Sequence, residues 1–444
     1  MGRILNGLDF ESIMAVVETI PHRRKDNRYT NFARNFKYFY QYLEKLSQIE
    51  LKEFAKTFLD KCQVIDIRSW NLGQATAMFN SLNSTGLPLY DSDIISSEMY
   101  AKASDRTAFK QAWQNLRQKV GELEIDKIVD MDKILTQLMY INRAKSGEYM
   151  YGTGGADVTV PGMKRYYIDL HRELLDHPME LCADLTKIAD IWAQIVTYPI
   201  VYLMARFNEN YKFYLISYLF KFDLSEITPT LVEKICRLLI KIFALIDITG
   251  IGYSSALVKS FLFKENVKLV KDTDLAEIEN DFRIHIDQNW KYDDVKQDIW
   301  DYYGDSLIYL NEYLYAQSHG KEFYLSDNAT IEHIMPASGR NYDIIREDAG
   351  ITDIEEFKKT VEMLGNKIVL EDKINIISSN GWFRTKKTKN IQSATGYRDS
   401  RYAIARDLVD YPGDEWGAKD INLCTERAAN RIVDFIFSGH IQGD

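Results

Sequence analysis

The stretch IEHIMP at residues 331–336 decides how the last third of this chain is interpreted. It places the carboxylate Glu332 directly before the imidazole of His333, between apolar residues. Residues 330–334, like residues 323–325, have the pattern of a short strand, on which neighbouring side chains point to opposite faces. Glu332 and His333 can therefore serve separate roles only if the strand bends, and Pro336 indicates that it does.

More polar residues follow at short intervals. The stretch LGNKIVL at residues 364–370 contains Asn366, and Asn375 comes nine residues after it. Six Lys or Arg and no Asp or Glu occur from residue 373 to residue 398: Lys373, Arg384, Lys386, Lys387, Lys389 and Arg398. In a chain of formal net charge −10, this is a strong local excess of positive charge, and it adjoins the His333 motif.

These residue types suit the hydrolysis of a phosphodiester. His333 is the candidate base, because the pKa of histidine lies near neutral pH and an attacking water must lose a proton. Glu332 and Asn375 offer oxygen ligands for Mg²⁺ or Mn²⁺, which would offset the charge that develops on the phosphate. Asn366 could orient the ring of His333 by a hydrogen bond. The predicted phosphate contacts, which carry no sequence information, are Arg384, Lys386, Lys387 and Lys389.

Each of these signals also has a structural interpretation. The dipeptide at 332–333 could be a surface pair beside a strand, and Asn366 could belong to a simple turn after Gly365. Asn375 could be an exposed helix residue, and a run of lysines is usually a solvated face. The combination and spacing of these residues favour the chemical interpretation over the structural one.

The chain upstream of residue 300 is predicted to be helical. Its 444 residues suggest two or three compact units, and its 8 prolines favour long helices. Residues 28–62 predict two helices. Thr228 and Pro229 are a typical helix start, and Gly250 a typical end. We expect a mainly α fold in three domains, 1–105, 106–300 and 301–444, the last of them α+β.

Composition and apolar patterning narrow the class of protein. The apolar fraction of 46% and the charged fraction of 27% are those of an ordinary soluble protein. The apolar stretch near 195–205 is too short to span a membrane, and no signal peptide is expected at the N-terminus. The four cysteines form no C-x-x-C pair. We expect a cytoplasmic protein without a membrane partner, whose DNA contacts come from a local basic patch.

The order of IEHIMP, LGNKIVL, Asn375 and the lysine-rich segment resembles the catalytic core of the HNH, or His-Me-finger, nucleases. More narrowly, it resembles the C-terminal domain of GmrSD-like type IV restriction proteins, as does WGAKDINLCTERAANRIVDFIF at 416–437. The resemblance implies a ββα-metal nuclease with His333 as general base, Asn366 as its orienting residue, and Glu332 and Asn375 near the metal. It also implies a role in a defence system against foreign DNA.

A second resemblance lies upstream. AMFNSLNSTGLPLYDSD at residues 77–93 is similar to a turn in the later part of the family's ParB-like, nucleotide-binding and modification-sensing domain. The D-G-x-x-R-type motif of that domain does not occur in the chain. We therefore expect residues 1–105 to be a remnant of it, either because this is a C-terminal fragment or because a partner chain supplies the rest.

Two classes of function remain open. The chain is either a DNA endonuclease or nickase, or a non-catalytic DNA- or protein-binding subunit that regulates a partner. If it is a nuclease, we expect it to cut DNA without nucleotide stimulation and without preference for modified DNA, because the sensor is missing. We also expect self-association through residues 60–100, where the absent domain would leave apolar surface uncovered.

Overall fold

The computed structural model describes residues 31–62, 90–125, 128–147, 160–339, 342–388, 390–391 and 394–438. Two compact units divide the chain: residues 1–135 with 162–189, and residues 136–161 with 190–444. Residues 77–89 of the upstream motif lie outside the described residues. The three predicted domain ranges therefore stay predictions.

The first unit is helical throughout its described part. Its elements are α3 (Asn31–Glu44), α4 (Gln48–Lys61), α6 (Asp91–Lys102), α7 (Arg106–Ile125), η1 (Arg165–Leu170) and η2 (Arg172–Asp176), and it shares α8 (Met131–Ser146) and α9 (Pro178–Ile195) with the second unit. The prediction of two helices within 28–62 is confirmed. Ser47 begins α4 with a capping box, since its hydroxyl accepts from Glu50 N and the Glu50 carboxylate accepts from Ser47 N.

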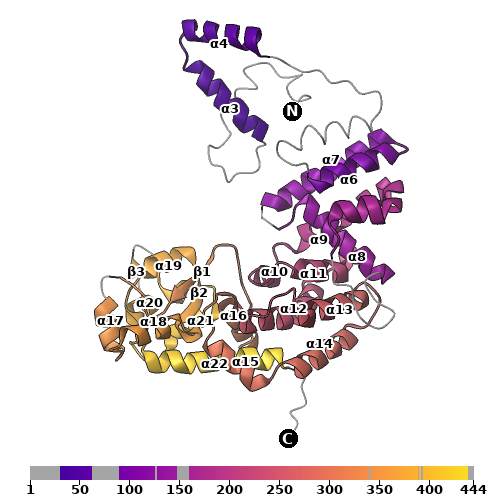
Figure 1. The fold of residues 1–444 in the computed structure, drawn as a ribbon. Coiled ribbons are helices and arrows are strands. Elements are labelled where there is room, and N and C mark those ends of the chain that lie inside the picture. Colours follow the sequence, from indigo (N-terminus) through magenta and orange to yellow (C-terminus); the bar gives the residue numbers. More distant parts are fainter. Residues whose placement is uncertain are drawn as a thin grey trace. The chain divides into compact units, whose positions relative to one another are not determined.

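The second unit begins with a helical block. Its elements are α10 (Pro199–Met204), α11 (Tyr211–Leu219), η3 (Leu224–Glu226), α12 (Pro229–Thr249), η4 (Ala256–Ser260), α13 (Phe261–Leu269), α14 (Leu275–Asn289), α15 (Tyr292–Trp300) and α16 (Ser306–Ser318) (Figure 1). The mainly α fold is confirmed. None of the helices in the described part of the chain is both long and apolar enough to cross a membrane.

Helix α12 has both of the ends that its sequence predicts. The Thr228 hydroxyl accepts a hydrogen bond from Leu231 N at 3.2 Å, and Pro229 occupies the first turn. Gly250 ends the helix with φ of 67°, a left-handed conformation that glycine adopts without strain. Between these ends, α12 buries an apolar face against α11, α14, α15 and α16, which makes it the core helix of the block.

The last part of the second unit combines short strands and helices. Its elements are β1 (Ala329–His333), α17 (Tyr342–Asp348), α18 (Ile354–Glu362), η5 (Leu364–Asn366), β2 (Lys367–Glu371), α19 (Asp372–Ser378), α20 (Phe383–Thr388), β3 (Asn390–Ile391), β4 (Ala394–Thr395), η6 (Tyr397–Asp399), α21 (Ala403–Asp407), η7 (Leu408–Asp410) and α22 (Ala418–Ile436). A strand at 323–325 was expected and is wrong. That segment is irregular, and Phe323 packs edge-on against Tyr313 of α16 instead.

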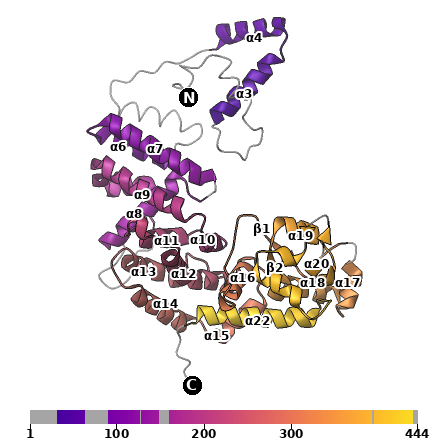
Figure 2. The same ribbon diagram turned by 180° about the vertical axis from the view of Figure 1, so that it is seen from behind.

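Strands β1 and β2 pair antiparallel, with His333 opposite Lys367 and Glu332 opposite Ile368. Helix α19 follows β2 directly and packs on both strands, as Figure 2 shows from behind. The expected antiparallel pair is present, with His333 on one strand and Asn375 on the helix after the other. It is not the predicted hairpin, because α17, α18 and η5 lie between the two strands in the chain. The order strand, strand, helix provides a short rigid frame for the polar residues of the motif.

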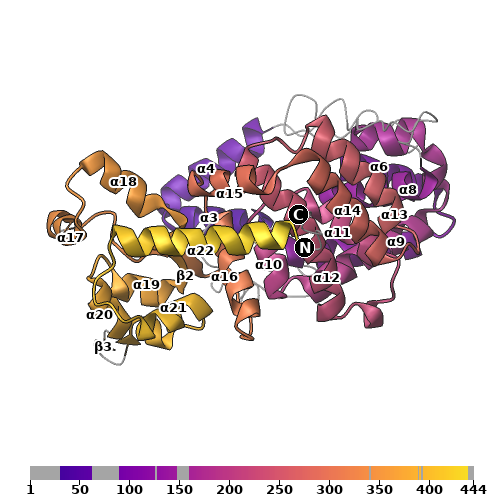
Figure 3. The same ribbon diagram turned by 90° about the horizontal axis from the view of Figure 1, so that it is seen from below.

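Helix α22 supports this frame from below. It packs against η5 and α18 at one end and against α12, α15 and α16 along its length, and Figure 3 shows it (yellow) running between these groups of elements. Gly365 lies in η5, and its backbone N donates to the Thr425 hydroxyl of α22 at 3.0 Å. A Cβ at Gly365 would overlap Ile421 O and Thr425 N. The glycine is therefore required by close approach of two backbones.

We predict that Gly365→Ala destabilises the protein, because the backbone of α22 must move to admit one methyl group. The expected loss is about 1–3 kcal/mol, the usual range for overpacking. Gly121→Ala in α7 is the matched control, since nothing lies within 4 Å of the added Cβ. It should raise stability by about 0.5–1 kcal/mol through helix propensity. Urea denaturation of both variants measures the difference, and equal midpoints would contradict the prediction.

Candidate active site

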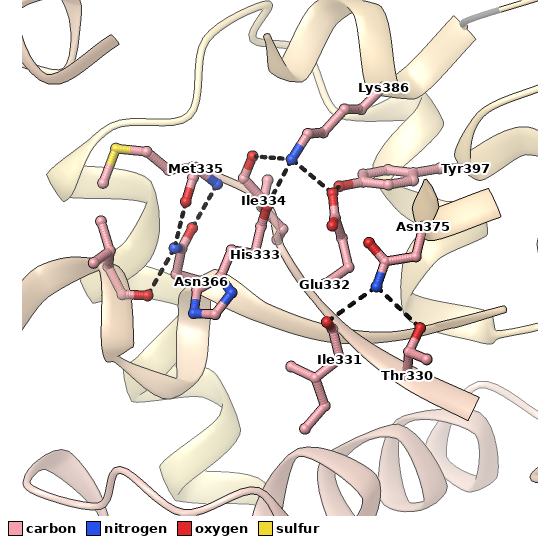
Figure 4. A network of polar contacts seen from close by, with 11 residues as sticks. Thr330, Ile331, Glu332, His333, Ile334, Met335, Asn366, Asn375, Lys386 and Tyr397 are labelled. Carbon is pink, nitrogen blue, oxygen red and sulfur yellow. Dashed lines mark hydrogen bonds and ion pairs between the residues drawn. The ribbon is translucent and has the colours of Figure 1, made fainter. Parts of the chain in front are cut away.

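The candidate site lies at the end of β1, where successive side chains leave the strand on opposite sides. In Figure 4 the His333 ring points away from the Glu332 carboxylate. The Glu332 side chain is buried, whereas the His333 side chain is 30% exposed. The structure therefore gives the two neighbours separate surroundings, one closed and one open to solvent.

His333 faces two charged residues. Its Nε2 is buried and lies 3.3 Å from Glu362 Oε1, but it has no hydrogen-bond partner of suitable geometry in the described part of the chain. The other oxygen of Glu362 lies 2.6 Å from Lys367 Nζ. Burial lowers the pKa of His333, Glu362 opposes this effect, and Lys367 adds to it. The imidazole is therefore neutral at neutral pH and can accept a proton.

Glu332 is held in a buried ion pair. Its Oε1 lies 2.6 Å from Lys386 Nζ and accepts a hydrogen bond from the Tyr397 hydroxyl at 3.0 Å. Burial raises the pKa of Glu332, while Lys386 and Tyr397 act to lower it. Burial also raises the pKa of Tyr397 well above its ordinary range, so this residue stays a hydrogen-bond donor.

Lys386 and Lys387 correct the sequence-based prediction of phosphate contacts. The exposed fractions of these residues are only 1% and 7%. Lys386 Nζ donates to His333 O and Ile334 O at 2.7 and 3.2 Å, besides its ion pair. Lys387 Nζ donates to two backbone carbonyls, at Tyr411 and Gly413. Both ammonium groups therefore point inward and donate to backbone carbonyls, because the face of α20 that carries them packs against the protein and not against solvent.

Arg384 is exposed, unlike Lys386 and Lys387 on the same helix. Its guanidinium stacks over the Trp382 ring at 5.4 Å, and its backbone N donates to Asp414 O. Lys389 lies outside the described residues. Of the four predicted phosphate contacts, Arg384 is thus the one that the structure places at the surface.

Asn366 also differs from its predicted role. Its Oδ1 accepts from Met335 N at 2.7 Å, and its Nδ2 donates to Met335 O and Val361 O at 2.9 and 2.8 Å. These bonds use both amide hydrogens and one lone pair of the oxygen, and none of them goes to the His333 ring. Its backbone O accepts from Ile334 N at 2.9 Å. Asn366 therefore acts on His333 through the backbone, by fixing the chain where β1 ends.

Asn375 lies on the Glu332 side of β1. Its Nδ2 donates to Thr330 Oγ1 at 3.0 Å and to Ile331 O at 3.2 Å, which fixes the orientation of the carboxamide. Thr330 and Glu332 leave β1 on the same side, because they are two residues apart on a strand. The Asn375 carboxamide, which is bound to Thr330, therefore lies on the face of the strand that carries Glu332. No group of three His, Cys, Asp or Glu suited to a metal occurs among the described residues.

Three residues of the site escaped the sequence analysis. Lys367 had a usable signal, since a strand at 367–371 paired with β1 puts it opposite His333. Glu362 and Tyr397 had none. They come from the end of α18 and from η6, 29 and 65 residues away from their partners His333 and Glu332. Only the packing of these segments brings them to the strand.

Comparison with protein families finds a match that covers this part of the chain. Residues 287–427 match the family described as GmrSD restriction endonucleases, C-terminal domain. The matched range contains every candidate site residue. It confirms the resemblance to GmrSD-like type IV restriction proteins. A search of curated proteins finds no match.

We predict that Lys386→Met destabilises the protein strongly, because it leaves the Glu332 carboxylate buried without a counter-charge. Breaking a buried ion pair in this way costs about 3–5 kcal/mol. The double variant Glu332→Gln, Lys386→Met should recover part of the loss, since no buried charge remains.

Lys358→Met is the matched control, because its ion pair with Glu355 is exposed and should contribute little. Urea denaturation measures all three variants. A Lys386→Met protein as stable as Lys358→Met would show that the buried pair does not hold the site together.

Proposed function

We propose, on the premise that residues 287–427 of this chain are the C-terminal domain of a GmrSD-family restriction endonuclease, that the chain is a metal-dependent DNA endonuclease or nickase of HNH type. The observation that carries the proposal is the neutral, partly exposed imidazole of His333 at the end of a strand–strand–helix frame. The relation to a restriction nuclease family rests on the match of residues 287–427 and does not depend on the site geometry.

His333 is the proposed general base. Its Nε2 is buried against Glu362, so Nδ1 is the nitrogen that takes the proton from the attacking water. The ring becomes an imidazolium as it does so. The Glu362 carboxylate at 3.3 Å then stabilises the positive charge, and the ion pair with Lys367 keeps that carboxylate ionised. Glu362 is in this sense a positioning residue for the base.

Glu332 and Asn375 are the proposed metal ligands. The described residues leave Glu332 Oε2 and Asn375 Oδ1 without hydrogen bonds, and these are hard oxygen donors of the kind that Mg²⁺ and Mn²⁺ prefer. When bound there, the cation would offset the charge that develops on the phosphate. Because Lys386 already balances the charge of Glu332, cation binding in the absence of DNA should be weak, and a DNA phosphate should strengthen it.

Lys386 and Asn366 have a supporting role in this proposal. Lys386 and Asn366 between them hold the carbonyls of residues 333, 334 and 335. These hydrogen bonds fix the backbone of the segment that carries His333. Preorganised geometry of this kind reduces the entropy lost in reaching the transition state.

DNA is the proposed substrate, and Arg384 is the proposed phosphate contact on this face. A contact through Lys389 remains a prediction, as do the nucleotide-binding partner chain and the self-association through residues 60–100. The alternative, a non-catalytic DNA- or protein-binding subunit, draws support from the fact that Glu332 is already ion-paired. It differs from the nuclease in one measurable respect, cleavage that depends on His333.

We predict cleavage or nicking of plasmid DNA in Mg²⁺ or Mn²⁺, abolished by EDTA and reduced at least about 100-fold by His333→Ala, the range for loss of a general base. His177→Ala is the control, because this histidine is exposed and far from the motif in sequence. Gel assays of both purified variants measure the rates. Equal cleavage by wild type and His333→Ala would refute the proposal, and DNA binding without cleavage would favour the alternative.

The pH dependence provides a second test. A protonated His333 cannot act as a base, so the rate should fall as the pH drops through its pKa, with a midpoint below the ordinary histidine value of about 6.5. Glu362→Gln removes the charge that raises this pKa and leaves Lys367 unopposed, so the acid limb should move to lower pH.

Glu355→Gln, an exposed residue on the same helix, should leave the profile unchanged. The measurement is kcat/KM for plasmid cleavage between about pH 4.5 and 8. A shift of the acid limb to higher pH in Glu362→Gln would contradict the assignment of Glu362 as the partner of His333.

A further inference from the structure

A cavity of about 440 Å³ opens in the helical block of the second unit, outside the range that matches the restriction family. Helices α12 and α14 and the end of α22 form it. Its polar and charged lining consists of Lys234, Arg237, Lys241, Glu279, Asn280, Arg283 and Ser438. Four cations thus face one carboxylate, in a chain whose formal net charge is −10.

Three of the four cations lack a partner of opposite charge in the described part of the chain, whereas Arg283 lies 3.5 Å from the Asp287 carboxylate. The three are Lys234, Arg237 and Lys241, which form a stripe along α12. Arg237 donates instead to the Tyr313 hydroxyl at 2.8 Å, and Lys241 donates to Ser438 Oγ at 2.9 Å. Burial lowers the pKa of Lys241, the charge of Arg237 lowers it further, and Glu279 acts in the opposite direction without cancelling the two. An anion in the cavity would remove this repulsion.

The shape of the cavity favours a compact anion. Its volume lies within the range of small-molecule sites, about 300–1,000 Å³. Phe435 lines it but is only 6% exposed, and the cations of Arg237 and Lys241 lie over its ring at 5.2 and 5.7 Å. The ring therefore offers no free face for stacking a nucleobase. Ala276 of α14 also lines the cavity, and its small side chain takes up little of the space.

We propose that this cavity binds an oligophosphate, a chain of two or more linked phosphate groups. The cations of α12 contact the phosphate oxygens, with Arg283 and Asn280 of α14 closing the other side. The site recognises the phosphate chain and not a base, so inorganic tripolyphosphate and the triphosphate of a nucleotide are equivalent ligands.

The test is titration calorimetry on the full chain with pyrophosphate, tripolyphosphate and a nucleoside triphosphate, without added metal. Saturable binding at one site is expected for all three ligands, with similar Kd for the two triphosphates. Lys234→Glu should weaken binding at least about 10-fold, because it reverses one charge of the lining and breaks no contact within the described protein. Lys241→Met should weaken it as well while keeping most of the side-chain volume.

Lys264→Glu is the matched control, because it makes the same charge change on an exposed position of α13 outside the cavity. It should bind like wild type. Absence of saturable binding, or equal loss in Lys234→Glu and Lys264→Glu, would overturn the proposal. A nucleotide that binds far more tightly than tripolyphosphate would overturn the equivalence of the two ligands. A variant that loses affinity for duplex DNA while pyrophosphate fails to bind would show that the face contacts DNA instead.

Discussion

The buried ammonium group of Lys386 is the contact on which the candidate site depends. It neutralises Glu332, which would otherwise be a buried charge, and it holds the carbonyls of His333 and Ile334 as the chain leaves the strand. One side chain therefore fixes both the carboxylate and the backbone of the adjacent base. A charge that is buried without a partner costs several kcal/mol, which explains why this contact cannot be replaced by solvent.

The rest of the domain keeps that contact in place. Asn366 closes the backbone after β1 from the opposite side, through bonds to Met335 and Val361. The glycine before it, Gly365, lets η5 lie against the backbone of α22. Helix α22 in turn packs on the core helices α12 and α16 of the same unit. His333 is therefore connected to the helical core by a continuous series of packed elements, from the end of β1 through η5 and α22.

Charge is distributed differently in the candidate site and in the cavity of this unit. Around His333, Glu362 is paired with Lys367 and Glu332 with Lys386, so the imidazole lies beside an ionised carboxylate whose charge is already balanced. In the cavity between α12 and α14, three cations lack such partners among the described residues. The first arrangement suits proton transfer, because it keeps the imidazole uncharged and able to accept a proton. The second suits anion binding, because the protein itself leaves the positive charge unbalanced.

The sequence by itself determined the mainly α class, the two ends of α12, the placement of His333 on a strand and the helix that carries Asn375. Each of these depends on residues within a few positions of one another, such as Thr228 and Pro229 before a helix, so the local signal is complete. The sequence did not determine the direction of the lysines in α20, the partners of the Asn366 amide or the neighbour of His333. Only the tertiary structure decided these, because Lys386 meets Glu332 across 54 residues and Glu362 meets His333 across 29. Whether a charged side chain points to solvent or to a buried partner depends on which segments pack together, and no local pattern contains that information.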